Sequence, residues 1–258
     1  MISFRFAFDV PRAGMSILAA ASFAALAAPA LAQTCAAKSG PRMAALVELY
    51  TSEGCNSCPP ADRWLSATIP AEANGAPAIA LAFHVDYWDR LGWPDRFASR
   101  RWTERQSRYA ALWRSESVYT PAVVLNGSEF RNWSGASVAV PNGKAAGVLI
   151  AKSTDGKTFE IEFRSAEGAA GSWDAHLALL GSGISSKIGA GENGGRNLQH
   201  DFVVLGLRDA EMQEQGEAKR SRLTIPSASE SGARLAVAVW VTAHDRLAPA
   251  QAIGGWLP

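Results

Sequence analysis

The sequence predicts an α/β domain over residues 43–155, followed by a small, β-rich, sandwich-like domain over residues 156–258. Apolar segments at 43–50 and 78–88 predict two strands. Between them, two consecutive prolines mark the start of a helix, so the order is strand, helix and parallel strand. Beyond residue 155, apolar or alternating segments are divided by Gly and Ser, as is typical of antiparallel strands. With 258 residues, 48% of them hydrophobic, the chain is long enough to form both cores.

Three further elements are expected in the first domain. The segment 94–113, rich in arginine and aromatic residues, predicts a helix. The apolar run from Ala122, followed by Asn126 and Gly127, predicts a hairpin with a type I′ turn. Residues 145–152 are expected to close the domain as a short helix.

The first 32 residues have the organisation of a secretory signal peptide. Arg5 and Arg12 precede an apolar stretch, and Ala30 and Ala32 supply the small-x-small pattern that a signal peptidase needs. We expect cleavage after Ala32, a periplasmic or secreted mature protein, and no stable membrane insertion once residues 1–32 are removed.

Charge and cysteine content narrow the function classes. The chain has 25 Lys and Arg against 24 Asp and Glu, a net charge of +1, which argues against a nucleic-acid partner. Three cysteines are too few for a disulfide scaffold in a chain of this length. Two of them, Cys55 and Cys58, stand three positions apart, a spacing that indicates chemistry at the pair.

The cysteine pair is expected at the start of a helix. Pro59 and Pro60 are tolerated only in a first helical turn, so the two cysteines should cap it. The unpaired N–H groups and partial positive charge of a helix N-terminus stabilise a thiolate. Cys55, expected to be open to solvent, is therefore the predicted nucleophile, and the more buried Cys58 would resolve a mixed disulfide. The alternatives from the spacing are an inert disulfide and half of a zinc site.

Four segments carry a family resemblance: Val47–Asp62 around the cysteines, Phe83–Trp88, Ser117–Pro121 and Gly191–Asp201. Together they resemble the secreted thioredoxin-like family that is catalogued only as a domain of unknown function. The resemblance implies a thioredoxin-like domain, with a central mixed sheet flanked by helices, and an appended β domain. It implies no established substrate.

The resemblance also implies roles for individual residues. Thr120 and Pro121 stand where the superfamily has a cis-proline facing the cysteine pair, so Pro121 is expected to be a substrate platform and Thr120 part of the substrate site. Glu48 stands near the place of a buried acid that takes a proton from Cys58 during resolution. The alternative for Glu48 is exposure to solvent or pairing with an arginine.

The second predicted strand ends in further candidates. Tyr87 and Trp88 lie at the end of this strand, where ligand sites of α/β sheets gather, and are expected to contact substrate. His84, with Cys55 and Cys58, is the alternative site for copper, because the arrangement resembles copper-handling thioredoxin-like proteins.

The sequence therefore predicts an exported thiol-disulfide oxidoreductase that acts on protein or small-molecule thiols and disulfides and needs no cofactor. The alternatives are a copper-binding thioredoxin-like protein and a binding module in which the disulfide is only structural. Cys35, near the mature N-terminus, is expected to be mobile and to be either a free thiol or an adventitious pair. The glycine-rich segment 189–194 is expected to be a mobile loop, not a nucleotide site, because no βαβ context surrounds it, and Arg196, His200 and Asp201 are expected at a domain contact.

Overall fold

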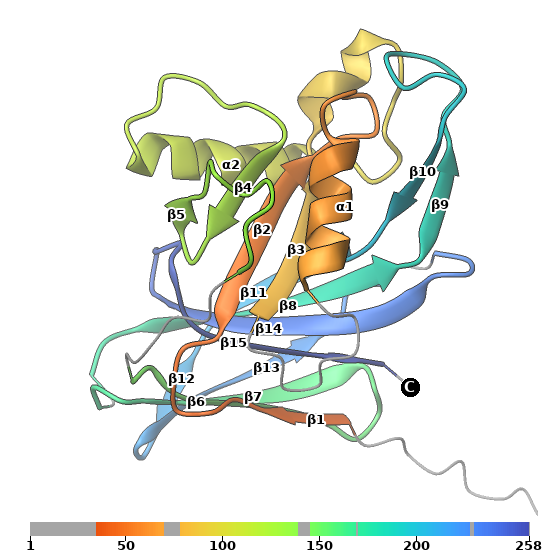
Figure 1. Ribbon diagram of the computed structural model, residues 1–258. Helices are drawn as coiled ribbons and strands as arrows, with labels where there is room; N and C mark the ends of the chain where they lie inside the picture. Colours follow the sequence, from red (N-terminus) through yellow and green to blue (C-terminus); the bar gives the residue numbers. More distant parts are fainter. Residues whose placement is uncertain (1–34, 70–77, 139–144, 169, 228–229, 258) are drawn as a thin grey trace, which may run out of the picture. The chain divides into compact units, whose positions relative to one another are not determined.

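The computed structural model describes residues 35–69, 78–138, 145–168, 170–227 and 230–257, and the expected signal peptide at 1–32 lies outside them. Figure 1 shows the elements. In chain order they are β1 Cys35–Lys38, β2 Ala45–Thr51, α1 Pro59–Thr68, β3 Ala78–His84, the 3-10 helix η1 Asp86–Leu91, α2 Arg100–Leu112, β4 Ala122–Leu125, β5 Ser128–Glu129, β6 Gly147–Ser153, β7 Thr158–Ser165, β8 Trp173–Ser182, β9 Ile184–Lys187, β10 Asn197–His200, β11 Val203–Glu211, β12 Gln213–Gln215, β13 Ala218–Thr224, β14 Arg234–Ala243 and β15 Pro249–Trp256. No helix in these described ranges is long and apolar enough to cross a membrane.

The strand–helix–strand unit expected around the cysteines is present. Strands β2 and β3 are parallel and in register from Ala45 opposite Ala78 to Thr51 opposite His84. Both strands are buried along their whole length, because a helix packs on each face. Helix α1 covers one face with Ala61, Trp64 and Leu65, and α2 covers the other with Trp102 and Tyr109.

Strand β4 forms the other neighbour of β2. The two strands are antiparallel, with Tyr50 opposite Ala122. Asn126 and Gly127 follow with φ of 52° and 83°, and this pair of positive values is what a type I′ turn requires. The turn leads back into β5, which pairs with the end of β4.

A second, five-stranded sheet has the order β1-β6-β7-β13-β12. Its apolar face packs against β8, β14 and β15 of the larger sheet. The residues in this contact include Leu149, Phe159, Ile161 and Phe163 from one sheet and Leu177, Val239, Val241 and Ile253 from the other. Strands β9 and β10 form a separate two-stranded sheet, and β10 lies beside α1 (Figure 1).

The expected α/β, thioredoxin-like domain followed by a separate β-rich domain is wrong. Strands make up 47% of the described residues and helices only 14%. The larger sheet has eight strands in the order β15-β14-β8-β11-β3-β2-β4-β5 and continues across residue 155. The physical reason is the free edge of β3, which β11 occupies in parallel, with Val203 opposite Ala82. Helices therefore cover only the part of the sheet around β2 and β3.

The short helix expected at 145–152 is also wrong, because this segment contains most of β6. Its side chains alternate between buried and partly exposed, the period of a strand with one covered face. Leu149 and Ala151 point into the core between the two sheets.

Candidate active site around Cys55 and Cys58

Cys55 and Cys58 form a disulfide at the start of α1, with their Cα atoms 5.4 Å apart. Cys58 is the N-cap residue, and Pro59 and Pro60 occupy the first helical positions, as the sequence predicts. A proline there loses no backbone hydrogen bond, because the first N–H groups of a helix have no partner within it. The N–H of Cys58 donates to the carbonyl of Cys55 at 3.2 Å and closes the turn that precedes the helix.

Both cysteines are 0% exposed, so the expected exposure of Cys55 is wrong. The two residues between them, Asn56 and Ser57, are exposed. The backbone of Gly54 lies against Trp88, since a Cβ added to Gly54 would be 3.6 Å from the Cβ of Trp88. The disulfide thus lies just beneath the surface, below an exposed turn.

A hydroxyl oxygen lies near each sulfur atom. The Oγ of Ser57 is 3.2 Å from the Sγ of Cys55, and the Oγ1 of Thr120 is 3.3 Å from the Sγ of Cys58. The Thr120 hydroxyl also donates to the carbonyl of Tyr50 at 2.8 Å, which fixes its position. The Thr120–Pro121 bond is cis, as expected, and the carbonyl of Thr120 is 3.9 Å from the Sγ of Cys55.

Tyr87 and Trp88 belong to η1 and are half-buried beside the same site. The hydroxyl of Tyr87 donates to the Oε1 of Gln106 at 3.2 Å, and the Nε2 of Gln106 donates to the carbonyl of Tyr119 at 2.6 Å. This chain of contacts links η1 through α2 to the turn that contains Thr120. Burial raises the pKa of Tyr87 to about 12, so its hydroxyl stays protonated at neutral pH.

The carboxylate of Glu48 accepts hydrogen bonds from three side chains. Arg105 donates to both of its carboxylate oxygens, at 2.8 and 2.9 Å, and the hydroxyls of Tyr50 and Tyr109 donate at 2.9 and 2.7 Å. Burial alone would raise the pKa of Glu48, but the charge and hydrogen bonds of Arg105 and the two tyrosines outweigh it and hold the pKa below its ordinary value. This geometry favours the alternative of an acid paired with an arginine.

A network of buried charged groups contacts the backbone of the turn that precedes Cys55. The Nδ1 of His84 lies 2.6 Å from the Oδ2 of Asp95, and the same oxygen accepts the backbone N–H of Glu53 at 2.8 Å. The carboxylate of Glu53 accepts the indole N–H of Trp93 at 2.8 Å and lies 3.3 Å from the Nε2 of His200, an ion-pair distance. Glu53, His84, Asp95 and His200 are all buried.

Within this network, His84 and Asp95 favour each other's ionised forms. Burial opposes a charge on His84, but Asp95 more than compensates and raises the pKa of His84. Burial likewise opposes a charge on Asp95, and His84 more than compensates and lowers the pKa of Asp95. Asp62, one helical turn beyond Cys58, has its pKa raised because burial outweighs the favourable charges of His200 and His84. The Nε2 of His84, both ring nitrogens of His200 and the Oε1 of Glu53 are buried and have no hydrogen-bond partner among the described residues.

The segment that joins β9 to β10 completes the site. The Nδ2 of Asn193 donates to the carbonyls of Glu53 and Cys55, both at 2.9 Å, and the Oε2 of Glu192 accepts the backbone N–H of Asn56 at 3.1 Å. Sequence reasoning missed these residues because it placed their segment in a separate domain. The signal was available in Gly191–Asp201, which contains Asn193 and His200 and belongs to the resemblance.

The alternative copper site would need His84 as a third ligand beside the two sulfurs. Among the described residues, no group of three or more His, Cys, Asp or Glu side chains is placed to hold a metal ion. The Nδ1 of His84 is already engaged by Asp95. Cys35 is a free thiol, as expected, but it lies in β1, paired with Ser153 of β6.

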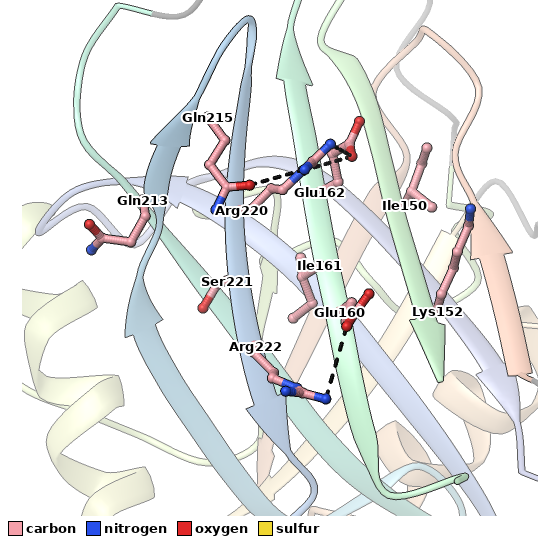
Figure 2. Close-up of a pocket in the computed structure, with 10 residues that line it drawn as sticks. All are labelled: Ile150, Lys152, Glu160, Ile161, Glu162, Gln213, Gln215, Arg220, Ser221 and Arg222. Atoms are coloured by element: carbon pink, nitrogen blue, oxygen red, sulfur yellow. Dashed lines mark hydrogen bonds and ion pairs between the residues drawn. The ribbon is translucent and has the colours of Figure 1, made fainter. Parts of the chain in front are cut away.

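A hollow of about 560 Å³ lies on the five-stranded sheet, among side chains of β6, β7, β12 and β13 (Figure 2). Four of its charged side chains form two pairs: Arg220 with Glu162 at 2.7 Å, and Arg222 with Glu160 at 4.0 Å (Figure 2). It shares no residue with the cysteine site and contains no cysteine or histidine.

Comparison with known proteins places this architecture in a family. The crystal structure of protein AGR_C_4864 from Agrobacterium tumefaciens has a similar fold, with a TM-score of 0.55 and 24% identity over 84% of this chain and 95% of that chain. HBP35 of Porphyromonas gingivalis is also similar, with a TM-score of 0.53 and 13% identity over 85% of this chain and 76% of that chain. No curated protein matches significantly. A family profile matches residues 46–242, most of the chain, and the chain therefore belongs to the family described as "Protein of unknown function (DUF1223)".

Proposed function

We propose that this protein is an exported thiol-disulfide oxidoreductase that acts through Cys55 and Cys58 on protein or small-molecule thiols and disulfides. The observation that carries the proposal is the disulfide at the N-terminus of α1, with a hydroxyl oxygen within 3.3 Å of each sulfur. The N-terminus of a helix stabilises a thiolate, which is both the attacking and the leaving form of a cysteine.

A purely structural role is a weaker account of the same disulfide. The stabilisation that a disulfide gives grows with the length of the loop it closes, and this one joins residues only three positions apart. The surrounding chain is already fixed by hydrogen bonds, which Asn193 donates and which Glu192 and Asp95 accept. The bond therefore adds little to the stability of the fold, whose hydrophobic core clusters include neither cysteine.

The chemical cycle is thiol–disulfide exchange. A substrate thiolate attacks the Sγ of Cys55, and Cys58 leaves with the electron pair of the broken bond and takes up a proton. A second substrate thiolate then attacks the substrate sulfur of the mixed disulfide, and Cys55 leaves as a thiolate. The products are one substrate disulfide and two reduced cysteines, and the reverse sequence reduces a disulfide. No cofactor is needed.

Two single substitutions test the proposal. Cys55→Ser should abolish exchange with dithiothreitol and with a reduced protein substrate, whereas Cys58→Ser should accumulate mixed disulfides on Cys55, visible by mass spectrometry. Cys35→Ser is the matched control and should behave as the unsubstituted protein, because Cys35 lies in β1 and bonds neither cysteine. Equal and mild effects of the first two substitutions would leave only a structural disulfide.

Export is tested separately. If residues 1–32 are a signal peptide, the protein recovered from its native host should begin at Gln33, as read by N-terminal sequencing. A full-length chain in the cytosolic fraction would contradict this part of the proposal.

A further inference from the structure

Asn193 makes a contact that the proposed exchange chemistry does not itself require. Its side-chain amide is 0% exposed and donates one N–H to the carbonyl of Glu53 and the other to the carbonyl of Cys55, both at 2.9 Å. Its Oδ1 accepts from Arg196 at 2.6 Å. Both donors and the acceptor of the amide are thus satisfied, and the side chain has a single well-defined orientation.

The two carbonyls held by Asn193 belong to the turn that leads into the disulfide. The carbonyl of Cys55 also accepts the N–H of Cys58, so Asn193 and the turn share one acceptor. Glu53 is fixed at three further points: its backbone N–H by Asp95, and its carboxylate by Trp93 and His200. The backbone from Glu53 to Cys55 is therefore held from both sides, and the position of the Cys55 Sγ relative to Cys58 follows from it.

We propose that Asn193 is a positioning residue that keeps Cys55 and Cys58 within bonding reach when they are reduced. This inference rests on the proposed function. When the two sulfurs of a dithiol are held close together, each thiol has a high effective concentration at the other. Closing the disulfide then costs little further conformational entropy. If the turn is released, Cys58 leaves the vicinity of Cys55 for part of the time, and mixed disulfides on Cys55 survive longer.

The experiment is a redox titration of the full chain in glutathione buffers. Two glutathione thiols reduce the disulfide to two cysteine thiols and become one molecule of oxidised glutathione, so the equilibrium gives the effective concentration of the pair directly. Asn193→Asp keeps the size of the side chain but points an oxygen at two carbonyls. We expect it to lower the effective concentration about tenfold and to increase glutathione bound to Cys55.

Asn197→Asp is the matched control. Asn197 lies four positions further along the same segment, is exposed, and contacts Ser185 rather than the cysteine turn. It should leave the titration unchanged. Equal titration curves for the unsubstituted protein and Asn193→Asp would overturn the proposal. If Asn193→Asp and Asn197→Asp both lower the free energy of unfolding and both keep the effective concentration of the unsubstituted protein, Asn193 is only structural.

Failure of the proposed function gives a different result. If the unsubstituted protein does not equilibrate with glutathione at all, the exchange activity and this inference are both wrong. If it equilibrates and Asn193→Asp gives the same titration curve, only the inference is wrong. If Asn193→Asp does not fold, NMR of the unsubstituted protein tests the role of Asn193 instead. The side-chain NH₂ of Asn193 should be protected from solvent exchange in the reduced as well as the oxidised state, and rapid exchange after reduction would contradict its role.

Discussion

The Oδ2 of Asp95 accepts from two partners at once, the Nδ1 of His84 at 2.6 Å and the backbone N–H of Glu53 at 2.8 Å. One carboxylate oxygen therefore connects the end of β3 to the turn that precedes the cysteines. Both side chains of the pair are almost completely buried. Removing only one partner of a buried ion pair leaves the other charge buried and unpaired, which is costly. Asp95 therefore stabilises both the fold and the position of the cysteine turn.

Asp95→Asn should lower the free energy of unfolding by roughly 3 to 5 kcal/mol, because it leaves His84 buried without its charged partner. Urea denaturation followed by circular dichroism measures the change. Asp209→Asn is the control: Asp209 has the same 2.6 Å contact to a histidine, His176, but its carboxylate is 40% exposed, so a smaller loss is expected. Equal losses in the two variants would contradict the role given to burial.

The contribution of the His84–Asp95 pair should depend on pH in a defined window. The raised pKa of His84 means that its contribution is fully present below the ordinary value of 6.5 and is lost as the pH rises through the raised pKa. The lowered pKa of Asp95 means that its contribution is fully present above 3.8 and is lost as the pH falls through the lowered pKa. The stability difference between the unsubstituted protein and Asp95→Asn should therefore be largest between about pH 4 and 6.5. A difference independent of pH would contradict the linkage.

Glu48→Gln should destabilise the fold without changing the chemistry. It leaves Arg105 buried with an uncharged partner, for an expected loss of roughly 3 to 5 kcal/mol in the free energy of unfolding. The rate of exchange at Cys55, measured on the folded fraction, should stay within about twofold of the unsubstituted rate, an effect far below that of losing an acid or base catalyst. A much slower rate with an altered pH profile would instead support the proton-accepting role that the resemblance implies for Glu48.

Thr120→Val should change the reactivity of Cys58. The hydroxyl hydrogen of Thr120 is donated to the carbonyl of Tyr50, so its oxygen faces the Sγ of Cys58 as an acceptor. This acceptor favours the protonated thiol, and without it the thiolate population rises. In the reduced Cys55→Ser background, alkylation of Cys58 by iodoacetamide should become several-fold faster on Thr120→Val. An unchanged or slower alkylation would show that the 3.3 Å contact does not hold the proton.

The local part of the site was predictable from the sequence because it depends on near neighbours along the chain. Consecutive prolines after Cys58 are compatible with one place only, the first turn of a helix, and α1 begins there. The apolar runs of β2 and β3 indicated parallel, covered strands, and both are buried throughout. The cis bond before Pro121 was expected from the resemblance and is present.

The distant part was not predictable in the same way. The apolar pattern of β3 indicates that it needs a neighbour on each side, but it does not identify β11, more than a hundred residues later, as that neighbour. Once β11 joins the sheet, the segment just before it is brought to the cysteine turn, and Asn193 and His200 with it. Glu48 was misleading for a related reason, since its partner Arg105 lies on another element, α2.

The contact between Asn193 and Cys55 spans 138 positions of the chain, and this separation has a consequence for the nascent protein. At the usual speed of synthesis, the cysteines emerge on the order of ten seconds before Asn193 has been made. During that interval the turn has neither Asn193 nor Glu192 over it, and its thiols are open to oxidants and to other thiols. If the chain is exported while it is being synthesised, the first oxidation of the pair would take place on an unfinished chain, and the later exchanges that we propose would take place on the closed site.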